Sequence, residues 1–120
     1  ATFTGTATTG LGYFSSLEVF VGLGTASGTS PTLDLFVDSR LDGGVNWINL
    51  GHFSQLLATA VNLVGRWSKR VDIATSVVLT SDAGAGTLRN VAWADDVRVR
   101  GTIGGTSPSY DINIWANLLA

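Results

Sequence analysis

The 120-residue chain is long enough for one domain, and a second domain is not expected. Charged residues make up 13% of the sequence and hydrophobic residues 45%, a composition that leaves a small monomer with apolar surface exposed, so we expect a homo-oligomer or a component of a larger assembly. The net charge of −2 argues against nucleic acid as the main partner, and the apolar runs are too short for a membrane-spanning helix.

The first segment, residues 1–12, is rich in Thr and Gly, and Phe3 is its only aromatic residue. It suits an edge strand or an arm that reaches a neighbouring molecule, and a frayed terminus explains it equally well. The start of the chain shows no signal-peptide pattern, and Ala1 suggests that an initiator methionine was removed in a cytoplasm. We assign residues 13–120 to the single domain.

Two stretches alternate apolar and polar residues, which is typical of half-buried strands. In Leu17–Leu23 the odd positions are aliphatic and Glu18 faces away from them. Leu33–Asp38 is read as a second strand of this kind. Between the two strands, residues 25–32 are expected to form a loop that contains Gly, Ser and Pro.

A four-residue segment of this loop is repeated later in the chain. Gly28-Thr29-Ser30-Pro31 is repeated as Gly105-Thr106-Ser107-Pro108, 77 residues further on. The flanking residues predict two related hairpins, each with one copy of the repeated segment as its loop. After each copy the strands alternate in the same phase, but before it the phases differ, so either a bulge intervenes or the likeness is local. A short match can also arise by chance in a chain so rich in Gly, Ser and Thr.

The remaining elements are expected in the following order. Residues 40–47 suit a Gly-containing turn before a strand that ends at Leu50. The apolar residues of 53–64 recur at helical spacing before Gly65, so this stretch is a short helix or an extended connection. Further strands are expected at 71–80, 88–93, 97–100 and 110–118. About eight short strands without helical crossovers predict an all-β fold, either a β-sandwich or a jelly roll.

Few residues in the sequence could carry catalysis. The chain has no cysteine and one histidine, His52, whose partners in a catalytic triad would be Ser54 with Asp38 or Asp42. Nothing in their spacing favours that arrangement, so we expect no catalytic residues and no enzyme activity. Asp34, Asp38 and Asp42 lie at four-residue intervals but lack the dense oxygen ligands of a calcium loop, and we expect no metal and no cofactor.

Aromatic residues are the more informative candidates. Phe20, Phe36 and Trp115 occupy positions on the polar side of their strands. Outward aromatic side chains anchor protein interfaces or stack on sugars, and in a chain with so little charge the first use is favoured. Together with Phe3 of the N-terminal segment, these three residues are the predicted interface anchors.

Several segments resemble small structural proteins of tailed bacteriophages. They are Ala26–Asp34, Asp38-Ser39 with Asp42-Gly43-Gly44 and Trp47, and Arg98–Ser109. The resemblance spans roughly Ala26–Phe53 and Val97–Ile114 and does not extend to residues 56–95. It implies a capsid decoration or cement protein, a compact β-sandwich or jelly roll that sits on the outer shell as a homo-oligomer, often a homotrimer. Such proteins stabilise the head by bridging subunits of the major capsid protein, and the resemblance supplies no catalytic residues.

We therefore expect a virion protein on the capsid surface, assembled in the host cytoplasm, whose partners are further copies of itself and the major capsid protein. Nucleic acid and membrane are not expected as partners. The alternative is a carbohydrate-binding or structural module of a phage tail or fibre, which would use Trp47, Trp67, Trp93 or Trp115 as stacking platforms. An enzyme built on His52 and Asp42 is a third hypothesis.

Overall fold

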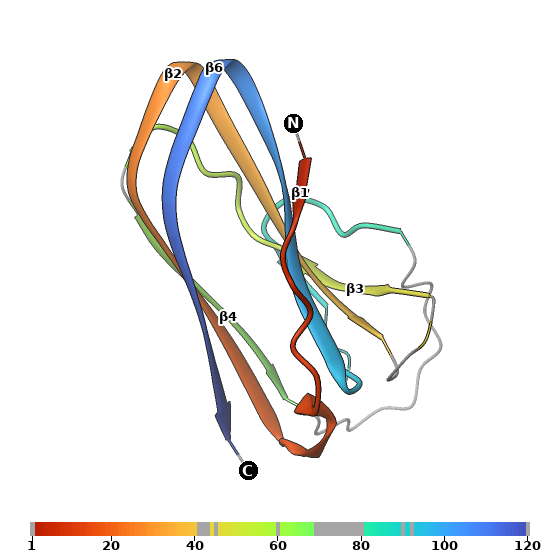
Figure 1. Cartoon of the computed structure of the whole chain (residues 1–120). Helices are drawn as coiled ribbons and strands as arrows, with labels where there is room; N and C mark the ends of the chain where they lie inside the picture. Colours follow the sequence, from red (N-terminus) through yellow and green to blue (C-terminus); the bar gives the residue numbers. More distant parts are fainter. Residues whose placement is uncertain are drawn as a thin grey trace.

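The computed structural model describes residues 2–40, 44, 46–59, 61–68, 81–89, 91 and 93–119 (Figure 1). Its strands are β1 (Thr2–Thr4), β2 (Ser16–Arg40), β3 (Ile48–His52), β4 (Val61–Ser68), β5 (Thr87–Leu88) and β6 (Asp96–Leu119), and a short 3-10 helix, η1, spans Leu11–Tyr13. The predicted all-β fold is confirmed. The strands differ from the predicted set of about eight short ones, because the described part of the chain contains six, of which β2 and β6 have 25 and 24 residues. The strand predicted at 71–80 lies outside the described residues.

The two long strands form the centre of the sheet. β2 and β6 pair in antiparallel register along their entire length, from Ser16 opposite Leu119 to Arg40 opposite Asp96. On its other side, the first part of β2 pairs with β4 and the last part pairs with β3. β1 adds to the first part of β6, and β5 adds to β3.

Both long strands bend back at the repeated Gly-Thr-Ser-Pro segments, where Thr29 lies opposite Thr106 (Figure 1). The two copies have the same backbone, with φ of 105° at Gly28 and 107° at Gly105, and of 48° at Ser30 and 49° at Ser107. The repeat is therefore structural. The prediction of two separate hairpins is wrong, because the strands pair with each other across the bend and turn over together.

The bend folds the sheet into two layers that face each other (Figure 1). The first layer contains β4, the first half of β2 and the second half of β6. The second layer contains β1, the first half of β6, the second half of β2, β3 and β5. Buried aliphatic residues of β2, from Leu17 to Val37, form much of the shared core, and Trp67 of the first layer donates a 3.1 Å hydrogen bond from Nε1 to the Leu50 carbonyl oxygen of the second. Burial of this core holds the layers together.

The predicted helix at 53–64 is wrong. Leu56 forms an isolated bridge with Leu33, and Val61 begins β4. Leu56 is buried, but Leu57 and Val64 are 56% and 55% exposed, so the apolar residues do not share one face. β-branched residues at 61 and 64 favour the strand. The extended alternative is correct for the described residues of this stretch.

The N-terminal segment follows β6 of the same chain. Phe3 lies opposite Gly101, Thr8 bridges Val97, and the Leu11 N–H donates a 3.0 Å hydrogen bond to the Asp95 carbonyl oxygen. Thr2–Thr4 form the edge strand β1, and the contacts of Thr8 and Leu11 keep the following residues along β6.

Candidate functional site

The described hydrogen bonds of His52, at the end of β3, involve neither Ser54 nor Asp38 of the predicted triad. Its Nε2 lies 2.9 Å from Oδ1 of Asp34, and its Nδ1 lies 3.0 Å from the carbonyl oxygen of Ala83. Asp38 is held by other residues, and Asp42 lies outside the described part of the chain. Both ring nitrogens of His52 therefore tie β3 to neighbouring segments, which is a structural use of the side chain.

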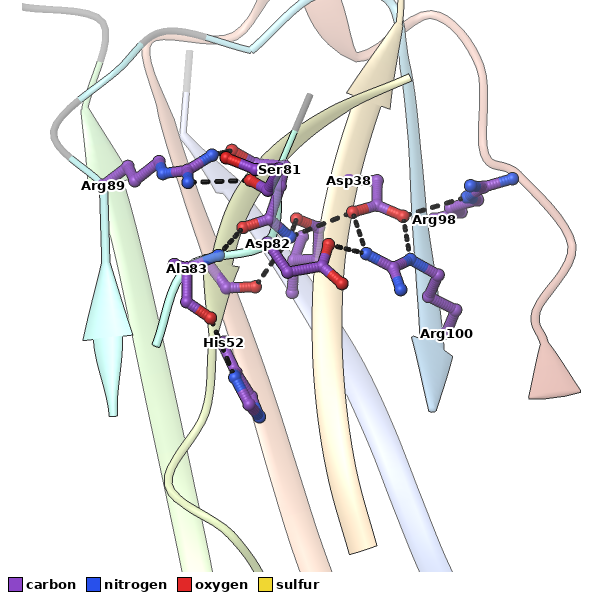
Figure 2. Close-up of polar contacts among 11 residues, drawn as sticks. Asp38, His52, Ser81, Asp82, Ala83, Arg89, Arg98 and Arg100 are labelled. Carbon is purple, nitrogen blue, oxygen red and sulfur yellow. Dashed lines mark hydrogen bonds and ion pairs between the residues drawn. The ribbon is translucent and has the colours of Figure 1, made fainter. Parts of the chain in front are cut away.

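Asp38 lies at the centre of a polar cluster on the outer side of the second layer (Figure 2). It is 2% exposed, and its carboxylate accepts hydrogen bonds from Nε of Arg98 at 3.1 Å, from Nε of Arg100 at 2.6 Å and from Nδ2 of Asn49 at 3.1 Å. Arg100 also pairs with Asp82. These five residues are called the Asp38 cluster below. Strand pairing places Arg98 directly opposite Asp38, and a β-bulge after residue 37 brings Asn49 beside it.

The Asp38 cluster is saturated with hydrogen bonds. Burial alone would lower the pKa of Arg100, but its hydrogen bonds with Asp38 and Asp82 outweigh burial and raise that pKa. Each oxygen of the Asp38 carboxylate accepts two hydrogen bonds. Oδ1 of Asn49 accepts a 3.0 Å hydrogen bond from the N–H of Ala83, which fastens residues 81–89 to the sheet. The Asp38 cluster therefore links β2, β3, β6 and residues 81–89 through hydrogen bonds and ion pairs.

A polar hollow of about 380 Å³ lies beside the Asp38 cluster, and Trp47 forms part of its lining. The guanidinium carbons of Arg40 and Arg98 lie 4.3 and 3.9 Å from the centroid of the Trp47 ring. The two arginines therefore occupy the ring of Trp47, and this tryptophan is a poor platform for a sugar.

The other tryptophans differ sharply in exposure. Trp67 and Trp93 are 2% and 3% exposed, and their Nε1 groups donate to backbone carbonyl oxygens within the core. Trp115 is 57% exposed. Among the four tryptophans of the chain, Trp115 is the one with a ring available for a partner.

Trp115 belongs to a surface on the outer side of the first layer. β2 lies in the middle of this surface, with β4 on one side and β6 on the other, and strand pairing aligns their outward residues in rows. We call this surface the Trp115 face. Its three rows follow one another along β2. The first contains Asn62, Gly22 and Asn113, the middle one contains Val64, Phe20 and Trp115, and the last contains Arg66, Glu18 and Asn117.

The middle row is apolar and exposed. Phe20 and Val64 are 38% and 55% exposed, beside Trp115. Gly22 leaves room for its neighbours, because a Cβ at this position would lie 3.5 Å from the Trp115 ring and 3.3 Å from Oδ1 of Asn62. The Trp115 ring and the Asn62 amide therefore both approach the backbone of Gly22.

The charged row of the Trp115 face is neutralised internally. Nε of Arg66 donates a 2.8 Å hydrogen bond to Oε2 of Glu18, and Nδ2 of Asn117 donates one of 3.0 Å to Oε1. These hydrogen bonds hold the pKa of Glu18 below its usual range, and the one from Arg66 has the largest effect. The face thus presents aromatic, aliphatic and amide groups around one closed ion pair.

The four predicted interface anchors separate into two groups. Phe20 and Trp115 are strand neighbours and both are exposed. Phe36 does lie on the outer side of its layer, but it is 9% exposed, because His52 stacks on it at 4.1 Å and Arg100 lies over its ring. Phe3 is half-buried against Gly101. Within one chain, two of the four predicted residues form a common surface.

Sequence reasoning missed the β4 residues of this surface, Asn62, Val64 and Arg66. Asn62 and Val64 fall in the stretch 53–64, which is predicted as a short helix or an extended connection, and Arg66 falls outside every predicted element. All three nevertheless alternate with inward-facing Leu63 and Gly65. That period of two was the available signal.

Comparisons with known protein families, with curated proteins and with solved structures find no match for this chain. In the described residues, no helix is both long enough and apolar enough to cross a membrane.

Proposed function

We propose that this chain is a non-enzymatic structural protein that acts by binding other proteins through the Trp115 face. The observation that carries the proposal is the exposed row of Trp115, Phe20 and Val64 on three paired strands. Apolar groups at the centre with polar groups around them are the usual anatomy of a protein interface. Aromatic side chains in such a centre supply a large share of the binding energy.

The proposed setting is a virus particle. The likeness of the sequence to small proteins of tailed bacteriophages supports a capsid decoration or cement protein on the outer shell. Its partners would be further copies of itself and the major capsid protein. In this role each molecule contacts more than one capsid subunit, and the added contacts must break before the shell opens. The role needs contact area and aromatic anchors, and it needs no catalytic group.

Binding to shells tests this proposal. The purified chain is mixed with shells assembled from the major capsid protein of the same genome, and the bound fraction is measured by sedimentation. We expect saturable binding, and Trp115→Ala should weaken it by about tenfold or more, as loss of a central aromatic residue does in other interfaces. Tyr13→Ala is the matched control, because Tyr13 is 91% exposed and lies outside the Trp115 face. Absence of binding, or equal losses in both variants, would contradict the proposal.

Carbohydrate binding is the second candidate, favoured by one observation. The Trp115 ring lies over Gly22 beside the amides of Asn62 and Asn113, and an exposed ring with neighbouring amides suits a sugar. A glycan array tests it, and Val64→Ser separates the two candidates. A sugar stacked on one ring would tolerate this change, whereas a protein contact across the row would be weakened.

A further inference from the structure

The second half of β6 is an edge of the first layer. Residues 112–119 pair with β2 on one side, and no described residue pairs with them on the other. Natural edge strands are protected by charged side chains, proline or bulges. Residues 112–119 contain no charged residue and no proline, and their register with β2 has no shift. Such an edge is a template for a further strand.

The edge borders an apolar groove between the two layers. The groove has a volume of about 330 Å³, and Ile114, Ala116 and Leu118 of β6 line it together with Val97 and other residues of both layers. Ile114 is 36% exposed although it faces the interior side of the sheet. A strand added at this edge would cover these side chains, so backbone pairing and apolar burial favour the same event.

The occupant can be inferred from the sequence of the edge itself. Ile112-Asn113-Ile114-Trp115-Ala116-Asn117-Leu118 has nearly the same chemistry in both directions about Trp115. If two such strands pair antiparallel with Trp115 opposite its own copy, each Asn113 faces Asn117, each Ile114 faces Ala116 and each Ile112 faces Leu118. Amides then meet amides on the outer side, and apolar groups meet apolar groups on the inner side.

We propose that this edge is the contact between two copies of the chain, related by a two-fold axis at Trp115. The first layers of the two copies join into one sheet, β4-β2-β6 followed by β6-β2-β4. Because directly opposite residues share a face, both Trp115 faces lie on the same side of this sheet. The proposal extends the proposed function by naming a second copy as a partner, but it depends only on the β6 edge. A two-fold contact gives a dimer, whereas the resemblance to phage proteins implies a trimer.

Charge variants at the two asparagines test both the contact and its register. Asn113 and Asn117 are exposed, and loss of the Asn117 hydrogen bond to Glu18 affects both double variants below equally, because both carry Asn117→Lys. The double variant Asn113→Lys with Asn117→Lys places like charges opposite each other twice in the dimer. The double variant Asn113→Asp with Asn117→Lys places opposite charges there instead. Asn62→Lys is the matched control, because Asn62 lies on the same face but on β4.

Mass is measured by light scattering over a concentration series, and folding is checked by circular dichroism. We expect a dimer for the wild type, for Asn62→Lys and for the opposite-charge variant. The two-lysine variant should dissociate about tenfold more readily or further, since like charges directly opposite in a sheet are destabilising. A wild-type monomer at every concentration, a trimer, or equal stability of the two charge variants would overturn the proposal. Each of these readouts is independent of binding to shells, so failure here is distinguishable from failure of the proposed function.

Discussion

Asp38 joins three strands through one carboxylate. It lies on β2, its arginine partners lie on β6 and its amide partner lies on β3, and their nitrogen atoms lie 2.6 to 3.3 Å from the carboxylate oxygens. A buried carboxylate with this many donors stabilises the fold only while every partner stays in place, because an arginine that loses its partner remains partly desolvated.

Replacement of Asp38 by Asn should therefore be costly. The variant removes the negative charge of Asp38 from between Arg98 and Arg100. The side chains of these arginines are only 21% and 26% exposed, respectively. We expect the free energy of unfolding to fall by about 2–3 kcal/mol, measured by urea denaturation. Asp111→Asn is the control, since Asp111 is exposed, and it should change stability by less than about 0.5 kcal/mol. Similar values for the two variants would show that the Asp38 cluster contributes little.

Glu18 predicts a dependence of stability on pH. Hydrogen bonds from Arg66 and Asn117 lower the pKa of Glu18 in the folded chain below the value of 4.5 expected when it is unfolded. The stability that this group contributes is present above the unfolded pKa and is lost as the pH falls through the folded pKa. Glu18→Gln should thus be less stable than the wild type at neutral pH, and the difference should shrink in acid. Urea denaturation of both proteins at several pH values measures it, and a difference that does not change with pH would contradict the assignment.

The bend of β2 and β6 is the element that depends most on particular residues. A Cβ added at Gly28 would lie 2.7 Å from the carbonyl oxygen of Ser107, and one added at Gly105 would lie 2.8 Å from that of Ser30. Both glycines also have φ in the left-handed region, at 105° and 107°. The two copies of the repeat thus meet as near-equivalent halves of one structure.

Because the two copies are nearly equivalent, the same substitution in either copy should lower the free energy of unfolding by the same amount. Gly28→Ala and Gly105→Ala should each lower the free energy of unfolding by about 1–3 kcal/mol, because both add backbone strain and a steric clash. Gly84→Ala should have little effect, since a Cβ there would meet nothing within 4 Å. Thermal unfolding of the three variants compares them directly. Unequal effects at Gly28 and Gly105 would show that the bend is not symmetric in energy.

The elements were predictable to the extent that their signals are local. Alternation identified the strands within Leu17–Leu23 and Leu33–Asp38, and the repeat marked the bend. Alternation could not reveal that these strands are halves of β2, because a bulged bend and a hairpin loop use the same residues. An extended connection that enters the core can carry apolar side chains on both faces. In residues 53–64 these side chains happen to recur at helical spacing, so a helix was among the predictions.

At the scale of the whole molecule, most pairing joins residues that are distant in sequence. Glu18 and Asn117 share a hydrogen bond although they are 99 positions apart. No local pattern specifies such a pair, which explains why Phe20 and Trp115 were predicted separately as outward residues but their common surface was not. Burial of Phe36 has the same origin, because His52 and Arg100, which cover it, come from different strands. A fold dominated by such contacts should form slowly compared with helical domains of its size.

The proposed pairing of β6 edges predicts which amides of residues 112–119 are protected from hydrogen exchange. Amides along an antiparallel strand alternate in direction, so between residues 112 and 119 one set points to β2 and the other points away from it. In a monomer the second set is exposed and should exchange rapidly, while the first set and the amides of the central part of β2 exchange slowly. In the dimer the second set donates to the other copy and becomes protected. We therefore expect the protection of alternate β6 amides to rise with protein concentration in the wild type and to disappear in the Asn113→Lys, Asn117→Lys variant. Rapid exchange of these amides at a concentration where the chain is dimeric would mean that the copies meet through a different surface.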